Sequence, residues 1–384
     1  MDLAFTDAEQ AFREEARSWL AANVPTGLPP MDSAEGFALH KEWEAELFEA
    51  RYAVVSWPEQ YGGRGASPME WLIFEEEYWG AGGPGRVSQN GIFLLAPTLF
   101  EHGTQEQQDR FLPPMASAEV TWAQGWSEPD AGSDLAGIAS KAVRDGDGWR
   151  LSGQKTWSTR AGFCDWAFGM FRSDPEAQRH KGLTYFLWPL DADGVTVRPV
   201  KGLGGGDAFA EIFLDEVHVA DDQVLGGVNE GWGVAMATAS SERGLTLRSP
   251  GRFLATAARL QDLAAREGVT DPAVREAIAR AWIKAEAYRL QTWWTISHLA
   301  EGGRMGAEAS MTKIWWSELD IELYEVARSI LGDRFPLEAG APAAVDGGAW
   351  LDGFLFSLAG PIYAGTNEIQ RNVVAERVLG LPRK

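Results

Sequence analysis

The spacing of apolar residues changes twice along this chain, and that change limits the folds it can adopt. Up to residue 118, and again from residue 229, apolar residues recur at helical spacing. Between residues 119 and 228, short apolar runs such as "LTYFLWP" and "AEIFLDEVHV" alternate with Gly, Asp and Ser clusters, which is typical of antiparallel strands. A chain of 384 residues also exceeds what one hydrophobic core usually holds.

We therefore expect an α+β fold with three domains: an N-terminal α-helical domain (1–118), a middle antiparallel β domain (119–228) and a C-terminal four-helix bundle (229–384). The first helix opens with a capping box, Thr6 to Glu9, and buries the face of Phe12, Ala16 and Leu20. Residues 34–52 and the run "MEWLIFEEEYWGAGG" predict two further helices. Residues 93–119 predict two more, broken at Pro113 and Pro114.

Charge and composition exclude several classes of function. The formal net charge of -21 argues against a nucleic-acid or anionic-membrane partner, because both would be repelled. The first 20 residues lack the basic and apolar regions of a signal peptide, and no run approaches the ~18 apolar residues that span a bilayer. A single cysteine, Cys164, fits a reducing cytoplasm. The five histidines show no metal-ligand spacing, so we expect no metal site.

Two polar segments near the start of the β region are candidates for ligand binding. In "AQGWSEPDAGSD" (123–134), small hydroxyls and exposed backbone N–H groups suit a polar heterocycle or a phosphate, although an ordinary turn has the same composition. In "LSGQKTWSTRAG" (151–162), Trp157 beside hydroxyls is able to stack on a flat ring, but a core tryptophan on a strand is equally ordinary. The glycines of "KGLGGGDAFAEIF" precede a strand, which indicates a flexible turn and not a phosphate loop.

Four motifs, in order, resemble the acyl-CoA dehydrogenase family along essentially the whole chain. They are "WSEPDAGSDLAG", "GWRLSGQKTWST", "FLDEVHVADDQVLGGVNEGW" and "IYAGTNEIQRNVVAERVLGLPR". The pattern is most similar to that of bacterial members that act in the catabolism of sterols or other bulky acyl groups. The resemblance implies a cytoplasmic flavoprotein oxidoreductase that works as a tetramer, with FAD held at a subunit interface and an acyl-CoA as substrate. It also implies electron-transferring flavoprotein as the electron acceptor.

The resemblance implies roles for individual residues. Those matched to FAD contacts are Gln124, Trp126, Ser127, Ser133, Trp157, Thr159, Gly365, Thr366 and Glu368. Those matched to substrate contacts are Ser133, Arg243 and the backbone N–H of Ala364, which would bind the thioester oxygen.

The residue before Gly365 and Thr366 is in many family members a glutamate that takes the α proton of the substrate. Here it is Ala364, which moves no proton. In branched-chain and long-chain members the base lies on the first helix after the β domain, at the position of Glu242, so the resemblance implies that Glu242 is the catalytic base. The alternative is a solvated pair of Glu242 and Arg243 on a helix surface. Glu368 matches a cofactor contact, and Asp215 and Glu216 end a strand away from the expected acyl site.

Two segments depart from the family pattern at the adenosine end of FAD. "AAREGVTDPAVREAIARAW" lacks the usual Phe-Gly, and "ARSILGDRFP" lacks the usual glutamine-glycine stretch. The chain is thus expected either to form a homo-oligomer that binds FAD by other residues or to form a hetero-tetramer with a paralogous subunit. Three other functions stay open: a dehydrogenase of an acyl carrier protein thioester, a flavin monooxygenase, and a catalytically silent subunit paired with an active paralogue.

Overall fold

The computed structural model describes residues 4–243, 249–303 and 306–382, without the side chains of residues 241–243. The chain divides into two compact units, each of which is assembled from separate stretches of sequence. The first, here called the helical unit, comprises Met1–Val24, Ala66–Pro84 and Arg243–Lys384. The second, here called the β unit, comprises Pro25–Gly65 and Gly85–Glu242.

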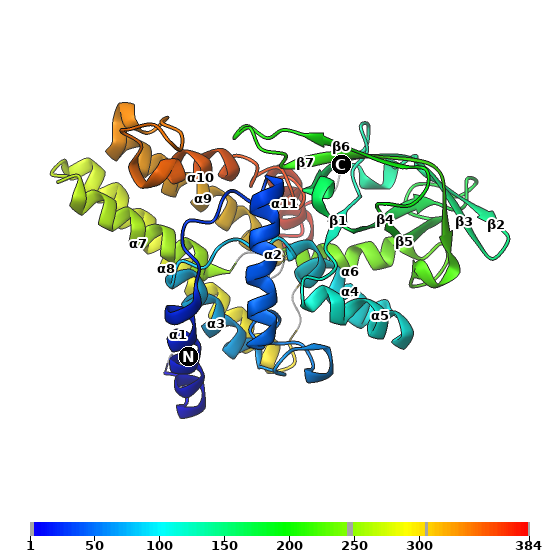
Figure 1. The fold of residues 1–384 in the computed structure, drawn as a ribbon, viewed down its shortest axis with the longest axis horizontal. Helices are drawn as coiled ribbons and strands as arrows, with labels where there is room; N and C mark the ends of the chain where they lie inside the picture. Colours follow the sequence, from blue (N-terminus) through cyan, green and yellow to red (C-terminus); the bar gives the residue numbers. More distant parts are fainter. Residues whose placement is uncertain (1–3, 244–248, 304–305, 383–384) are drawn as a thin grey trace. The chain divides into compact units, whose positions relative to one another are not determined.

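The helical unit joins helices from both ends of the sequence. Its helices are α1 (Asp7–Asn23), α3 (Pro68–Gly80), α7 (Pro250–Arg266), α8 (Pro272–Ala300), α9 (Ala309–Leu331), α10 (Ala349–Ser357) and α11 (Asn367–Val373). Shorter turns are η6 (Gly332–Arg334), η7 (Val345–Gly348) and the π-helical η8 (Val374–Val378). Helix α3 packs on α1, α7 and α8, so that an N-terminal helix lies against helices of the C-terminal part (Figure 1).

The predicted amphipathic pattern of the first helix is confirmed. Thr6 and Glu9 form the capping box of α1, and Phe12, Ala16 and Leu20 are its buried residues. The core of the helical unit is built mainly by α7, α8 and α9. Its fully buried side chains include Phe253, Leu260, Ala285, Tyr288, Trp316 and Leu323.

The β unit contains an eight-stranded sheet covered by helices. The described strands are β1 (Trp122–Gln124), β2 (Lys141–Asp145), β3 (Gly148–Thr159), β4 (Trp166–Arg172), β5 (Leu183–Pro189), β6 (Val195–Val200), β7 (Phe209–Ala220) and β8 (Val224–Leu225). The helices are α2 (Ala34–Glu49), α4 (Ala96–His102), α5 (Gln105–Ala116) and α6 (Gly231–Arg243), with the π-helical η2 (Asn90–Leu95). Single turns are η1 (Glu59–Tyr61), η3 (Leu135–Gly137), η4 (Ala161–Phe163) and η5 (Asp221–Gln223).

The sheet runs in the order β6-β7-β3-β2-β4-β5-β8, with β1 added beside β4. Most neighbours are antiparallel, as predicted, but β1 runs parallel to β4, and β2 meets β4 in parallel at the single pair Lys141–Arg172. The long β3–β7 ladder has register shifts between Leu151 and Gly153 and between Lys155 and Ser158. Such bulges bend a strand and redirect its side chains. The second shift lies directly at the candidate residue Trp157.

One helix boundary predicted from the sequence is wrong. Pro113 and Pro114 do not separate two helices but lie in the last turn of α5, which ends at Ala116. The break comes earlier, because Gly103 leaves the helical conformation and Thr104 starts α5 with a capping box. Each proline lacks the N–H that would donate to the carbonyl four residues earlier, so the last turn of α5 forms without those two hydrogen bonds.

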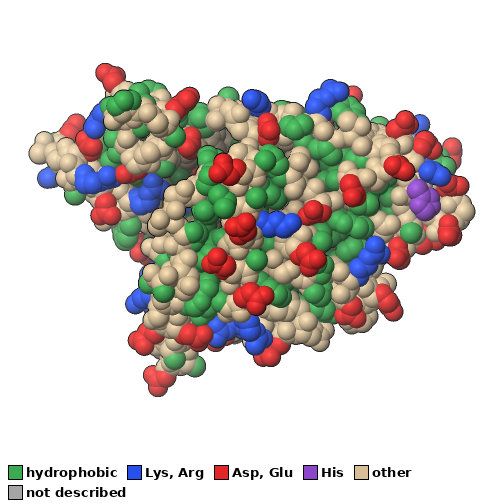
Figure 2. All heavy atoms as spheres, viewed as in Figure 1, with side chains coloured by type: hydrophobic (Ala, Val, Ile, Leu, Met, Phe, Trp, Pro, Cys, Tyr) green, Lys and Arg blue, Asp and Glu red, His purple; other side chains and the backbone are tan. Residues whose placement is uncertain are grey.

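No helix among the described residues is long and apolar enough to cross a membrane. On the face drawn in Figure 2, Lys and Arg side chains are interspersed with Asp and Glu side chains.

Candidate functional site

The first candidate segment follows β1 and leaves the sheet with unused hydrogen-bond donors. The Gly125 N–H donates to the Phe168 carbonyl at 2.9 Å, and a Cβ at Gly169 would meet the Gly125 oxygen at 2.1 Å, so this approach requires glycine. Beyond Gly125, the backbone N–H groups of Trp126 and Ser127 have no acceptor among the described residues. The indole nitrogen of Trp126 is buried and likewise has no partner there. Buried donors without a protein partner are rare, and they fit a bound polar ligand.

Trp157 is held in an unusual backbone conformation with its ring in the open. Its φ is +58°, its side chain is 62% exposed, and its ring meets that of Phe209 edge-to-face at 5.7 Å between centroids. A bulky residue with positive φ is an outlier. The structure therefore excludes the reading of Trp157 as a core residue and leaves a flat aromatic surface for stacking.

The β unit brings these two segments together. The Thr156 N–H donates to the Ser127 carbonyl at 2.8 Å, so the loop after β1 lies beside the end of β3. Thr159 ends β3 opposite Phe209, and the hydroxyl of Ser158 is buried without a partner among the described residues. Ser133 is exposed on the loop that follows Ser127. Gln124 is the last residue of β1.

The second candidate segment is a turn in the helical unit that contains two consecutive left-handed residues. Ala364 has a φ of +58° and Gly365 a φ of +77°. The backbone N–H of Ala364 has no acceptor among the described residues. The carbonyls of Ala364 and Gly365 both accept from the side-chain amide of the buried Gln370, at 3.1 and 3.2 Å. The turn is thus fixed through its carbonyls, and the Ala364 N–H is left to donate.

Thr366 starts α11, and its hydroxyl accepts from the Ile369 N–H at 3.3 Å. The carboxylate of Glu368 accepts hydrogen bonds from the Glu368 backbone N–H and from the Thr366 hydroxyl. These bonds hold the pKa of Glu368 below its ordinary value, so Glu368 is anionic at neutral pH. An anion in the first turn of a helix is favourable.

Sequence reasoning missed the residues that support this turn. The buried ammonium of Lys313 on α9 donates to the Asn367 side-chain oxygen at 2.8 Å, and the Ser317 hydroxyl donates to the same atom at 3.2 Å. Lys313 and Asn367 are 54 residues apart, so no local sequence pattern predicts the contact. The only signal was the polar Asn367 itself, directly after the capping threonine.

The proposed base lies at the end of a well-anchored helix. Gly231 opens α6 against β5, where a Cβ would meet the backbone of Thr184 at 2.7 Å, and Thr238 of α6 contacts Thr98 at 2.9 Å and Tyr185 at 3.2 Å. Glu242 and Arg243 are the last two residues of α6, and their side chains lie outside the described residues.

Of the alternative carboxylates on β7, that of Glu216 is engaged elsewhere, because it accepts from the Ser152 hydroxyl at 2.6 Å. The backbone N–H of Asp215 donates to the Gly194 carbonyl. No group of three possible metal-ligating side chains is present in the described part of the chain.

The two segments that depart from the family pattern carry arginines that are already paired. Arg266 makes a bidentate ion pair with Asp346 at 2.9 and 2.8 Å, and the guanidinium of Arg334 binds Glu267. Cations paired with carboxylates of their own unit are poorly suited to hold a pyrophosphate.

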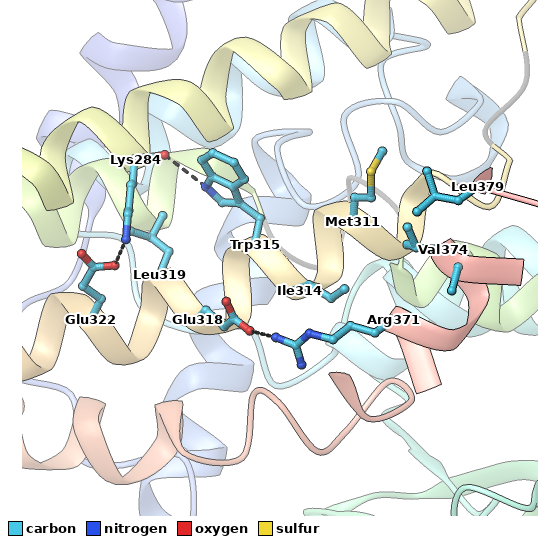
Figure 3. A pocket seen from close by; sticks show the side chains of 11 residues that line it. Lys284, Met311, Ile314, Trp315, Glu318, Leu319, Glu322, Arg371, Val374 and Leu379 are labelled. Atoms are coloured by element: carbon cyan, nitrogen blue, oxygen red, sulfur yellow. Dashed lines mark hydrogen bonds and ion pairs between the residues drawn. The ribbon is translucent and has the colours of Figure 1, made fainter. Parts of the chain in front are cut away.

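A groove of about 440 Å³ opens in the helical unit between α8, α9 and η8. Figure 3 shows Met311, Trp315 and Leu379 along it, with ion pairs between Lys284 and Glu322 and between Arg371 and Glu318. The Trp315 indole donates to the Lys284 carbonyl at 3.3 Å. The residues that line the groove include none of the candidate site residues, and several of its apolar side chains are exposed.

Each unit by itself offers groups that fit a flavin. The β unit offers an exposed indole next to unpaired N–H donors, and the helical unit offers a cap threonine, a carboxylate and a left-handed turn. Donors of this kind bind the edge of a heterocycle, while the indole covers its face.

Comparisons with known proteins agree with this fit. Residues 6–119 match the acyl-CoA dehydrogenase N-terminal domain, residues 123–217 its middle domain and residues 229–379 its C-terminal domain. The acyl-CoA dehydrogenase IpdE1 of Mycobacterium tuberculosis is 39% identical over 387 residues, covering 98% of this chain and 99% of the relative. IpdE1 of Mycolicibacterium smegmatis is 38% identical over 395 residues, with 98% of each chain covered.

Solved structures agree over the full length. The Tcur3481-Tcur3483 steroid ACAD superposes with a TM-score of 0.88 at 30% identity, covering 100% of both chains. The ChsE4-ChsE5 complex of Mycobacterium tuberculosis gives a TM-score of 0.85, also at 30% identity and full coverage of both chains. The three matched domains, the fold and the near full-length relatives show that this chain belongs to the acyl-CoA dehydrogenase family of flavin-dependent oxidoreductases.

Proposed function

We propose that this enzyme dehydrogenates the α and β carbons of an acyl-CoA thioester with a branched or bulky acyl group, and that Glu242 takes the α proton. The observation that carries this proposal is the turn at Ala364. It keeps a free backbone N–H, as a thioester oxygen requires, but it bears a methyl group where many family members bear the catalytic carboxylate.

Each residue then has a defined role. The Ala364 N–H donates to the thioester oxygen and stabilises the enolate character that develops there as the α proton leaves. Glu242 acts as the general base, and Arg243 orients the thioester arm. Bound FAD would supply, at its N5, the acceptor for the hydride of the β carbon. The small side chain of Ala364 leaves volume beside the α carbon, which supports a bulky acyl group.

Each unit, taken by itself, offers residues for FAD. In the β unit, Gln124, Trp126 and Ser127 would present backbone donors to the isoalloxazine, and Trp157 with Thr159 would pack on it. Ser133 would contact both FAD and the substrate. In the helical unit, Gly365, Thr366 and Glu368 would contact FAD.

We further propose that a paralogous subunit supplies contacts to the adenosine end of FAD. Two structures with 30% identity are described as complexes of two differently named proteins, Tcur3481 with Tcur3483 and ChsE4 with ChsE5. The internal pairing of Arg266 and Arg334 supports the same idea, since neither cation is free for a phosphate. Exposed apolar side chains on α8 and α9 are available for a subunit contact; they are Ile283, Leu290, Trp294, Met311 and Trp315. Electron-transferring flavoprotein would be the electron acceptor.

The base is tested by Glu242→Gln, which retains size and polarity but accepts no proton at neutral pH. We expect loss of flavin bleaching by substrate in anaerobic stopped-flow measurements, with the FAD content unchanged. Glu216→Gln is the control for a carboxylate that lies away from the expected acyl site, and it should keep the bleaching reaction. Reduction of Glu242→Gln at the wild-type rate would refute the assignment.

The substrate and the partner are tested separately. Titration with straight, branched and steroid-like acyl-CoAs, and with an acyl carrier protein thioester, should show the fastest bleaching with a bulky acyl-CoA. Expression of this chain alone, followed by a flavin-to-protein ratio and a mass measurement, tests the partner. Full FAD occupancy in a homotetramer would remove the case for a second subunit, and bound FAD without any bleaching would point to a silent subunit.

A further inference from the structure

A charged pair lies fully inside the β unit between the two segments that face the candidate flavin site. The Lys155 side chain is 0% exposed and that of Glu128 is 8% exposed, and the ammonium donates to the carboxylate at 2.8 Å. The same ammonium donates to the Met170 carbonyl at 2.8 Å and lies 4.5 Å from the centre of the Phe171 ring. A buried ion pair is seldom more stable than an apolar pair of similar volume, so its value must lie in what it positions.

Glu128 closes the loop that carries Ser133. One of its carboxylate oxygens accepts from the Ala139 N–H at 2.6 Å, and the Ser140 N–H donates to the carboxylate at 3.1 Å. At the other end of the loop, the Glu128 N–H donates to the Ala131 carbonyl at 2.9 Å. One buried carboxylate therefore ties together the start and the end of residues 128–140.

Lys155 fixes the strand that carries Trp157. The β-bulge begins at Lys155, and the next residue, Thr156, donates its N–H to the Ser127 carbonyl. Ser127 is one residue before Glu128, and Trp157 is two residues after Lys155. The pair is thus the side-chain link between the loop donors and the indole, and neither charged group reaches the surface.

We propose that the Glu128–Lys155 pair is the positioning device of the flavin site: it holds the Trp126–Ser127 donors and the Trp157 ring at the separation that a bound isoalloxazine needs. This inference rests on the proposed function, because it assumes that these groups contact FAD. Glu128 and Lys155 are positioning residues and touch neither substrate nor cofactor.

The test uses the full chain, in whichever assembly the wild type binds FAD. The double variant Glu128→Gln/Lys155→Met removes both charges and keeps the volume, so it should fold. We expect its Kd for FAD to rise about tenfold or more, and the visible circular-dichroism bands of the bound flavin to change. The single variant Lys155→Arg, which keeps the charge, should retain most of the wild-type affinity for FAD.

The matched control is Glu44→Gln/Arg86→Met, which neutralises another buried pair of the β unit, with side chains 1% and 6% exposed. It should lose similar stability in urea but keep the wild-type FAD affinity and flavin spectrum. If the double variant at 128 and 155 does not fold, Glu128→Asp, which shortens the carboxylate by one methylene, takes its place.

A folded variant with wild-type FAD affinity and an unchanged flavin spectrum would overturn the inference. Equal effects of the two double variants would also overturn it, because the pair would then act through stability alone. If the wild type binds FAD neither alone nor with a partner, the proposed function fails first, and that outcome differs from both.

Discussion

Two buried lysines hold the two candidate segments, one in each unit, and they do so with different chemistry. Lys155 in the β unit is paired with the carboxylate of Glu128, whereas Lys313 in the helical unit donates to the neutral amide oxygen of Asn367. Both side chains are 0% exposed. The comparison teaches that the same residue type secures one segment through a carboxylate and the other through an amide oxygen, and these two contacts should respond differently to substitution, pH and salt.

The largest expected effect comes from Lys155→Met alone. It leaves the Glu128 carboxylate buried without a counter-charge, which costs about 3–5 kcal/mol of stability. The midpoint of urea unfolding, followed by tryptophan fluorescence, should fall strongly. The second change Glu128→Gln should recover most of this loss, and a double variant as unstable as the single one would contradict the charge argument.

Lys313→Met should have a smaller effect. Its removal leaves the neutral Asn367 oxygen with the Ser317 hydroxyl as a remaining donor, so the expected cost is about 1–3 kcal/mol. The same urea measurement checks it. A loss equal to that of Lys155→Met would erase the proposed difference between the two lysines.

The pH dependence sharpens the comparison further. Burial raises the pKa of Glu128, but the Lys155 ammonium and the hydrogen bonds outweigh burial and hold that pKa below its ordinary value. Because the folded pKa is depressed, the stabilisation is present above the unfolded carboxyl value of about 4.3 and is lost as the pH falls through the folded pKa.

Urea midpoints measured from pH 6 downward should therefore fall less steeply for Glu128→Gln/Lys155→Met than for the wild type. Lys313→Met should keep the wild-type slope, since Asn367 does not titrate. Parallel curves for all three proteins would contradict this expectation.

The smallest effect is expected at the surface pair of Arg371 and Glu318, whose side chains are each 53% exposed. Arg371→Ala should change the stability by no more than about 1 kcal/mol, because solvent screens the pair. The difference should shrink further when the urea titration is repeated in 1 M salt. A loss as large as that of Lys313→Met would show that this pair, too, supports the turn at Ala364.

The sequence predicted local features well where the signal was local. The capping box at Thr6 and the stripe of Phe12, Ala16 and Leu20 were confirmed because both depend on residues within four positions of each other. The prolines at 113 and 114 misled the prediction, because the last turn of α5 includes them although each lacks the N–H of a helical hydrogen bond. The exposure of Trp157 could not be predicted, since composition fits a core tryptophan equally well.

The sequence by itself determined the order of helical, β and helical segments, the family motifs, and the absence of a carboxylate at Ala364. Only the tertiary structure decided that α3 packs on α7 and α8 of the C-terminal part, and that the N–H groups of Ala364 and Ser127 have no acceptor in the described part of the chain. It also decided the partners of the two buried lysines, which lie 27 and 54 residues away. The physical reason is that burial and hydrogen-bond satisfaction are set by contacts between distant segments, which no local spacing encodes.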